Sequence, residues 1–221
     1  MSFDTLATLL TSRQSCRGYL PDPVPQSETE AVLTTAQNVP SWCNSQPWHV
    51  TACGSEETNR LREALYAHAA QAKHNSDVPF PSAYEGLYKD RRRECGWQLY
   101  DAVGVQKGDR EGSGRQMMEN FRLFGAPHFL LITTPKALGP YGILDCGAFA
   151  TAVLLGFEAR GIGAIAMASV AGFAGFMRGW FDVPDDRDIL CGISFGYADQ
   201  NHPANAFRTT RAPLAEVVDW R

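Results

Sequence analysis

The sequence predicts a single α+β domain with a mixed central sheet surrounded by helices. The chain has 221 residues, which is enough to bury one large core. Its first part is rich in helical periodicity, whereas its later part alternates apolar, strand-like segments with helical ones. The sequence has no internal repeat, low-complexity tract or clear linker, so we expect one domain over residues 1–221.

Two helices are expected before residue 40. Apolar residues at helical spacing predict the first, from Phe3 to about Ser12. The second is predicted to begin at Ser27, which forms a capping-box pattern with Glu30. It runs to about Asn38, because the Val-Pro pair that follows disfavours helical backbone.

The next segments are a strand, a helix and a less regular region. Residues 48–53 alternate large and small side chains and predict a strand, and residues 55–73 predict a helix with one apolar face. Residues 74–114 are interrupted by prolines and glycines, and contain one predicted helix at 91–103. We expect this region to be an excursion from the core that acts as a lid.

The longest apolar helix is predicted at residues 141–160, after a dense apolar strand at 128–133. Gly161 closes this helix, and its apolar residues lie most of the way round, so we expect it to be central and buried. Within it, Asp145 is expected to have a hydrogen-bonded structural role. The later elements are a strand or extended turn at 162–169, a short helix at 172–181 and a strand at 189–197.

The composition argues against several classes of function. A net charge of −4 disfavours sequence-independent binding to nucleic acid, which needs a basic face. Six cysteines are scattered without metal-ligand spacing, so we expect reduced thiols, a cytoplasmic protein and no metal. No signal peptide is evident, and the most apolar stretch, residues 149–155, is too short to span a bilayer, so no membrane association is expected.

Two polar clusters lie on either side of the second predicted helix. The first places Arg13, Ser15 and Arg17 at alternate positions just after an apolar helical stretch. Two guanidinium groups and a hydroxyl within five residues suit a phosphate, because arginine forks match phosphate oxygens and stay charged. Arginines after a helix also complement the negative end of its dipole, and this cluster alone leaves both interpretations open.

The second cluster is a loop between two prolines that is rich in amide and hydroxyl groups. Its members are Ser41, Asn44, Ser45 and Gln46. Such groups can both donate to and accept from a flat heterocycle of mixed polarity. An ordinary polar turn before a strand would explain the same residues, and the Pro-Ser start of the loop fits that interpretation too.

Together, the two clusters resemble the FMN-dependent nitroreductase family, in which R-x-S-x-R is followed at about this distance by P-S-x-x-N-x-Q-P-W. The matching segments are RQSCR at residues 13–17 and PSWCNSQPW at residues 40–48. The resemblance covers most of the chain and is closest to nitrobenzoate and dinitroaniline reductases, whose Gly-Tyr-Ala-Asp and Arg-Ala-Pro segments are paralleled at residues 196–199 and 211–213. It implies a nitroreductase-like fold that forms a domain-swapped type of homodimer.

The resemblance implies that FMN binds between the two clusters. Arg13, Ser15 and Arg17 would hold its phosphate and ribityl chain, and Gln14 would contact the isoalloxazine ring or the ribityl chain. The loop would come from the neighbouring subunit and lie across the flavin, which places the active site at the homodimer interface. The loop residues concerned are Pro40, Ser41, Trp42, Asn44 and Gln46. Trp42 departs from the smaller residue often found in the family, and could narrow the pocket or stack near the flavin.

Two further segments match the family. Residues 161–169 resemble the segment whose backbone N–H points at flavin N5, so Met167, Ala168 and Ser169 would line the flavin. Ala168 or Ser169 would supply that N–H and are the predicted catalytic positions. Many members have an acidic residue here and this chain does not, so no side-chain role is expected. Arg211, with Arg208 as a second candidate, would close on the phosphate, although a solvated tail arginine is the alternative.

The implied activity is the reduction of small nitroaromatic compounds at the expense of NADPH or NADH. Both ligands would use the same flavin face in turn, so the kinetics would be ping-pong, with nitroso and then hydroxylamine products. Reductive dehalogenation or ene reduction on the same scaffold is an alternative. A non-catalytic FMN-binding protein is another.

Overall fold

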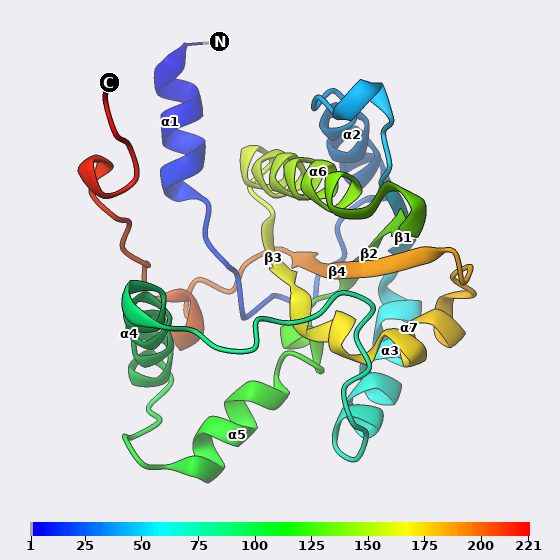
Figure 1. Ribbon diagram of the computed structural model, residues 1–221. Coiled ribbons are helices and arrows are strands. Elements are labelled where there is room, and N and C mark those ends of the chain that lie inside the picture. The colour runs from blue at the N-terminus through cyan, green and yellow to red at the C-terminus, as the bar shows by residue number, and fades with distance from the viewer. Residues whose placement is uncertain (1) are drawn as a thin grey trace.

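The computed structural model describes residues 2–221, and its centre is a four-stranded sheet (Figure 1). The sheet contains β1 (His49–Cys53), β2 (His128–Pro135), β3 (Gly163–Met167) and β4 (Arg187–Gly196), in the order β1-β2-β4-β3. All three strand pairings are antiparallel. The α+β class is therefore confirmed, and the parallel component expected of a mixed sheet is reduced to one bridge, between Ser15 and Ala164.

Helices cover both faces of this sheet. On one face, α2 (Gln26–Ala36) and α6 (Gly139–Ala159) pack over Leu130 and Ile132 of β2. On the other face, α3 (Ser55–Ala69) and α7 (Ala174–Phe181) pack over Phe129 and Leu131. Alternate residues of β2 thus enter two different cores, which explains why this strand is an unbroken apolar run in the sequence.

The first two helix predictions are confirmed in position, with one error in capping. The first helix, α1 (Phe3–Ser12), has the predicted bounds. The second begins at Gln26, with Pro25 at the N-cap, so the capping box predicted at Ser27 and Glu30 is wrong. Pro25 starts the helix earlier because its ring fixes a φ angle compatible with helix entry, and the Gln26 side-chain amide donates to Glu30 instead, at 2.7 Å.

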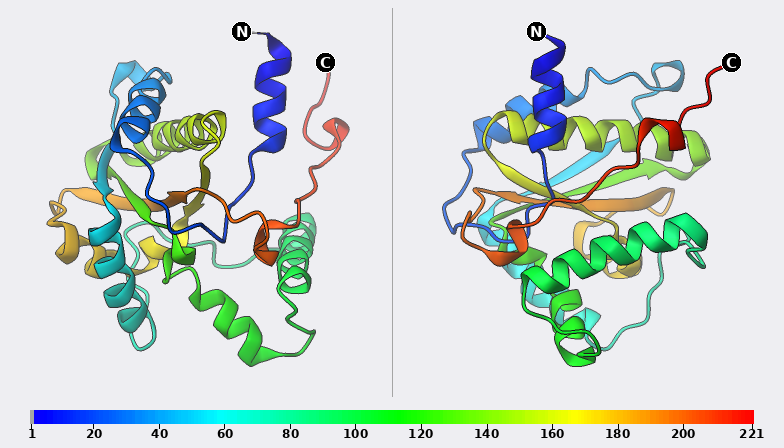
Figure 2. Two further views of the ribbon diagram at one scale, coloured as in Figure 1. Left: turned by 180° about the vertical axis from the view of Figure 1, so that it is seen from behind. Right: turned by 90° about the vertical axis from the view of Figure 1, so that its left-hand side faces the viewer.

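The region from 74 to 114 is more helical than predicted. It contains α4 (Gly86–Ala102), which begins before the predicted 91–103, and the start of α5 (Arg110–Met118), which was not predicted. The glycines of this segment suggest a loop, but Asp109 caps α5 by accepting the Gly112 N–H at 2.7 Å. In Figures 1 and 2, α4 and α5 lie outside the layers that cover the sheet.

The long helix α6 is buried on one side only, which corrects the prediction that it is buried all round. Cys146, Phe149, Val153 and Phe157 face the sheet, whereas Leu144 on the opposite side is 68% exposed. By length and composition alone, residues 136–159 would pass as a membrane-spanning helix. In the fold, one face of this segment belongs to the protein core, and its other face is apolar and open.

The two ends of the chain project away from the sheet (Figures 1 and 2). Helix α1 has no buried residue, and its Phe3 is 81% exposed. The C-terminal segment after residue 206 ends in a short turn with Leu214, Val217 and Trp220 exposed. Helix α1 contacts α6, but most of its surface stays uncovered within the protomer, and a ten-residue helix has little stability of its own in water.

We predict that His128 makes the fold sensitive to mild acid. Its buried ring accepts the Val24 N–H at Nε2, at 2.9 Å, and burial lowers its pKa below the ordinary value. The unfolded chain therefore binds the proton more readily. This contribution to stability is complete above about pH 6.5 and is lost as the pH falls through 6.5 toward the folded-state pKa.

The measurement is the urea-unfolding free energy of wild type and His128→Gln between pH 5 and 8. Glutamine keeps an acceptor for Val24 but does not titrate, so its stability should fall less between pH 7 and 5. His49→Gln is the control, because His49 is exposed on β1. Identical pH profiles for wild type and His128→Gln would contradict the assignment.

Candidate functional site

The first polar cluster lies along the edge of the sheet, where the chain leaves α1 and runs beside β3. The Cys16 N–H donates to Ala164 O at 3.2 Å, and the Tyr19 hydroxyl donates to Cys16 O at 2.9 Å. Burial raises the pKa of Tyr19 well above its ordinary value, so the phenol keeps this donor proton. Because Cys16 points into the protein, its neighbours Ser15 and Arg17 point outward, as extended backbone requires.

A cavity of about 780 Å³ lies on the outer side of this segment. It brings together six predicted site residues from opposite ends of the chain. They are Arg13, Gln14, Ser15, Arg17, Arg208 and Arg211. Leu10, Thr11, Cys95, Phe207 and Thr209 complete the lining, and none of these was predicted.

The charge of this cavity is uncompensated. Four arginines line it and no aspartate or glutamate does. None of the four guanidinium groups forms an ion pair anywhere within residues 2–221. In a chain of net charge −4, such a concentration of unpaired positive charge favours a multiply charged anion.

Arg17 is the most enclosed of these arginines. Its guanidinium carbon lies 5.7 Å from the ring centroid of Phe207 and 6.0 Å from that of Phe124, and Nη1 donates to Ser15 O at 3.3 Å. Burial lowers its pKa, but arginine's ordinary pKa is so high that the group stays charged. The aromatic faces therefore hold a cation in place without neutralising it.

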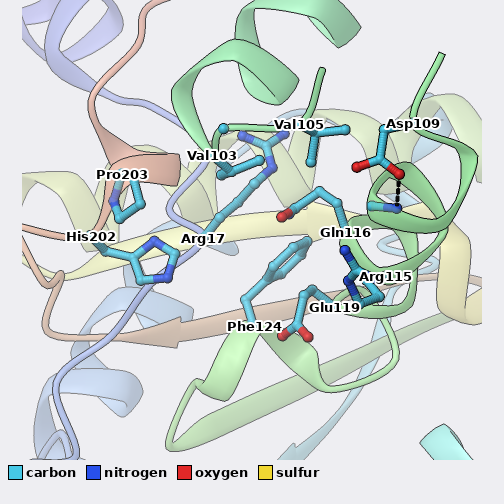
Figure 3. A pocket seen from close by; sticks show the side chains of 12 residues that line it. Arg17, Val103, Val105, Asp109, Arg115, Gln116, Glu119, Phe124, His202 and Pro203 are labelled. Atoms are coloured by element: carbon cyan, nitrogen blue, oxygen red, sulfur yellow. Dashed lines mark hydrogen bonds between the residues drawn. The ribbon is translucent and has the colours of Figure 1, made fainter. Parts of the chain in front are cut away.

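Arg17 also borders a second cavity, of about 400 Å³. Figure 3 shows the side chains of Arg17, Gln116 and Phe124 converging there from separate elements. This lining mixes Asp109 and Glu119 with Arg115, and so has no single sign of charge. The larger cavity differs from it in charge, because its charged lining residues are all arginines.

The second polar cluster does not reach the larger cavity within the protomer. The loop at residues 40–46 lies at the N-terminal part of α6, where the Trp42 N–H donates to Asp145 Oδ2 at 3.0 Å. The predicted structural role of Asp145 is thereby confirmed. The Trp42 indole, 63% exposed, lies 5.1 Å from the Tyr141 ring on the open side of α6.

The loop is held in an uncommon backbone conformation. Cys43, Asn44 and Gln46 have positive φ angles of 51°, 55° and 46°, which are disfavoured for residues other than glycine and least so for asparagine. The Ser41 hydroxyl accepts the Gln46 N–H at 3.0 Å and closes the loop. A conformation of this kind persists only when its surroundings impose it, so the exposed groups of the loop are presented in a fixed arrangement.

The third predicted segment follows the same strand that the first cluster borders. Met167 ends β3 with its side chain in the core, at 3% exposure, so only its backbone is available to a ligand. Ala168 is exposed, and the Ser169 hydroxyl lies 3.2 Å from Asn120 Oδ1. Ala168 and Ser169 begin a 3₁₀ helix, so their N–H groups have no partner inside that helix.

The lining residues missed by sequence analysis come from outside the recognised motifs. Cys95 lies on α4, in the region predicted only as a lid, and Phe207 and Thr209 flank Arg208 in the tail. A search of the residues next to Arg208 and Arg211 would have included Phe207 and Thr209. No sequence signal pointed to Cys95, because α4 reaches the cavity through tertiary packing alone.

Comparison with known proteins agrees with this arrangement. A model of the nitroreductase family matches residues 10–197. The nitroreductase NfnB of Mycolicibacterium smegmatis is 32% identical over 211 residues, which cover 95% of this chain and 90% of that protein. A 4-nitrobenzoate reductase of a Nocardioides species is 30% identical over 224 residues, with coverages of 99% and 91%.

The fold is also similar to that of a solved structure. The crystal structure of the FMN-dependent nitroreductase NfnB from Mycobacterium smegmatis in complex with NADPH gives a TM-score of 0.94 at 31% identity. The match covers 99% of this chain and 98% of that chain.

We predict that inorganic phosphate stabilises the protein through the larger cavity. At a phosphate concentration of about 100 times Kd, the gain in stability would be about 2.7 kcal/mol, which raises the unfolding temperature by several degrees. Arg13→Gln and Arg208→Gln should each lose at least about half of this gain. Arg60→Gln is the control, because Arg60 is exposed on α3 and paired with Glu57. Equal shifts in all variants in thermal denaturation would identify phosphate as a general stabilising salt instead.

Proposed function

The chain belongs to the nitroreductase family, and on that premise we propose that it is an FMN-dependent oxidoreductase that uses NADPH to reduce nitroaromatic compounds. The observation that carries the proposal is the cavity with four unpaired arginines, which suits the phosphate of FMN. Similarity to a nitroreductase and to a 4-nitrobenzoate reductase supports a nitroaromatic substrate.

The residues present fit an FMN molecule. Arg13, Arg17, Arg208 and Arg211 would hold its phosphate, with Ser15 and Gln14 beside the ribityl chain. The ring system would then extend along the edge of β3. There the backbone N–H groups of Ala168 and Ser169 would donate hydrogen bonds to the ring. Backbone donors suit this role because they are fixed in place and do not titrate.

FMN, when bound, would supply the two-electron redox chemistry that links oxidation of the nicotinamide to reduction of the nitro group. The chain itself would bind the flavin, orient the two substrates against it and shield the site from water. No acidic or basic side chain is needed at Ala168 or Ser169, since a backbone donor stabilises developing charge without competing for a proton. We propose that the reductant and the nitroaromatic occupy one site in turn, which gives ping-pong kinetics.

We further propose that the active site is completed in a homodimer. The open face of α6 presents Tyr141 and Leu144, and Trp42 of the loop packs beside Tyr141, which makes one continuous exposed apolar surface. The exposed apolar residues of α1 and of the C-terminal segment are also unpartnered within the protomer. Monomeric proteins rarely expose contiguous apolar surfaces of this kind. A second copy that covers α6 would bring its own loop, residues 40–46, to the arginine-rich cavity of the first copy.

The region 74–114 is proposed to cover the cavity as a lid. Its start is held by Asp77, whose carboxylate accepts from Arg178 at 2.7 Å and from the Ile189 N–H at 2.9 Å. Its helix α4 meets the C-terminal segment, where Arg91 pairs with Glu216 at 2.8 Å. The same helix supplies Cys95 to the cavity lining, so a movement of α4 would change access to the arginines.

The test of the proposed function is an anaerobic titration followed by visible absorbance. The purified protein should be yellow, lose colour on addition of NADPH, and regain it on addition of a dinitroaromatic. Failure to regain colour would overturn nitro reduction and move the search to halophenols and enones. A protein that keeps its colour with NADPH and with NADH would be a flavin-binding protein without turnover. A colourless protein that takes up no FMN would contradict the proposal as a whole.

If the open face of α6 is the dimer interface, a charge introduced at Leu144 should disrupt the dimer. Leu144→Glu places a charge on the open face of α6 without disturbing the buried face. It should convert the dimer to a monomer in analytical ultracentrifugation and weaken FMN binding by at least about tenfold, because a buried unpaired charge is strongly unfavourable at an interface.

The matched control is Ala67→Glu, which adds the same charge to an exposed position of α3. It should leave both the oligomeric state and the FMN affinity unchanged. A wild-type monomer at micromolar concentration, or a dimer that tolerates Leu144→Glu, would rule out this interface.

A further inference from the structure

Asn205 is a buried asparagine whose side chain is fully hydrogen-bonded. It lies in a short 3₁₀ turn (Pro203–Asn205) and is 5% exposed. Its Oδ1 accepts the Arg17 N–H at 2.7 Å. Its Nδ2 donates to Gly18 O and to Asp199 O, both at 2.9 Å. The side chain does not line the larger cavity, so its contacts are with the backbone that supports the cavity.

The same residue contacts the second group of arginines through its main chain. Arg208 Nη1 donates to Asn205 O at 3.0 Å. Asn205, which lies 188 residues after Arg17 in the sequence, therefore connects Arg17 with Arg208. An amide side chain suits this connection, since one acceptor and two donors lie in a single plane, and neither a carboxylate nor a hydroxyl offers that set.

The surrounding turn is shaped for this contact. The Asn205 N–H donates to His202 O at 2.9 Å, and His202 Nδ1 accepts the Ala204 N–H at 3.3 Å. The His202 ring lies so close to Gly18 that a Cβ there would come within 2.1 Å of it. Only glycine allows the two segments to approach closely enough for the Asn205 amide to bridge them.

We propose that Asn205 is a positioning residue that orders Arg17 and Arg208 for the phosphate group of FMN. This inference rests on the proposed function, and it assigns a role to a residue outside every recognised motif. Asn205 holds the Arg17 backbone and restrains the Arg208 guanidinium before the ligand arrives. Ordering these groups in advance removes part of the entropy loss that binding would otherwise impose. The benefit applies to a phosphate-bearing flavin and not to riboflavin, which lacks the phosphate.

The experiment compares the affinities for FMN and riboflavin, measured by quenching of flavin fluorescence on the flavin-free protein. Wild type should bind FMN more tightly than riboflavin. Asn205→Ala should bind FMN about tenfold more weakly and change riboflavin affinity by less than about twofold. Thr58→Ala is the matched control: Thr58 is fully buried on α3 and bonds Cys53 O, so its loss weakens the fold away from the cavity and should preserve the preference for FMN.

A second measurement does not depend on a variant. In wild-type protein without flavin, the Arg17 amide hydrogen should exchange with solvent slowly, at a rate close to that of the sheet amides. Exchange as fast as in exposed loops would overturn the inference, and so would an Asn205→Ala variant that keeps the wild-type preference or loses both affinities equally. If wild type itself fails to prefer FMN over riboflavin, the phosphate site and hence the proposed function fail first, which separates the two failures.

Discussion

The fold depends on the antiparallel pairing of β2 with β4 at the centre of the sheet. Both strands are buried between two apolar layers, so their backbone polar groups need partners inside the protein, and pairing with each other and with the neighbouring strands supplies most of these. Because β2 alternates its side chains between the two layers, a shift of one residue would exchange the two cores. This constraint also fixes β3 at the edge, and an edge strand has unpaired groups to which the segment with Arg13 and Arg17 attaches.

The site follows from that attachment. The extended segment buries Cys16 and turns Ser15 and Arg17 outward, and the C-terminal turn adds Arg208 from the other end of the chain. Four guanidinium groups in one cavity repel one another, and no carboxylate within residues 2–221 pairs with them. Their arrangement is therefore unfavourable for the isolated protomer and becomes favourable when an anion is bound. Asn205 bonds the Arg17 backbone and the Arg208 guanidinium, and the rings of Phe124 and Phe207 flank the Arg17 guanidinium.

A second unfavourable feature of the isolated protomer is its exposed apolar surface. Helix α6 is apolar on both sides, but only the side that faces the sheet is covered. The loop that carries Trp42 is anchored to this helix by Asp145, and it does not line the arginine-rich cavity of its own protomer. Unpaired positive charge in one place and uncovered apolar surface in another both point to ligands outside the protomer: an anion for the first and a second copy of the chain for the second.

Much of this molecule could be predicted from the sequence, because the relevant signals are local. Helical spacing located α1, α3 and α6, and alternation and apolar runs located the strands. The R-x-S-x-R spacing singled out Arg13 and Arg17, which line one cavity in the structure. The errors arose where a neighbour overrode a pattern: Pro25 displaced the cap expected at Ser27, and Asp109 began α5 among glycines. Only the tertiary structure decided the antiparallel strand order, the exposed side of α6, and the meeting of Arg17 with Arg208 through Asn205. Periodicity encodes which face of an element is apolar, but contacts between segments 188 residues apart depend on how the whole chain packs.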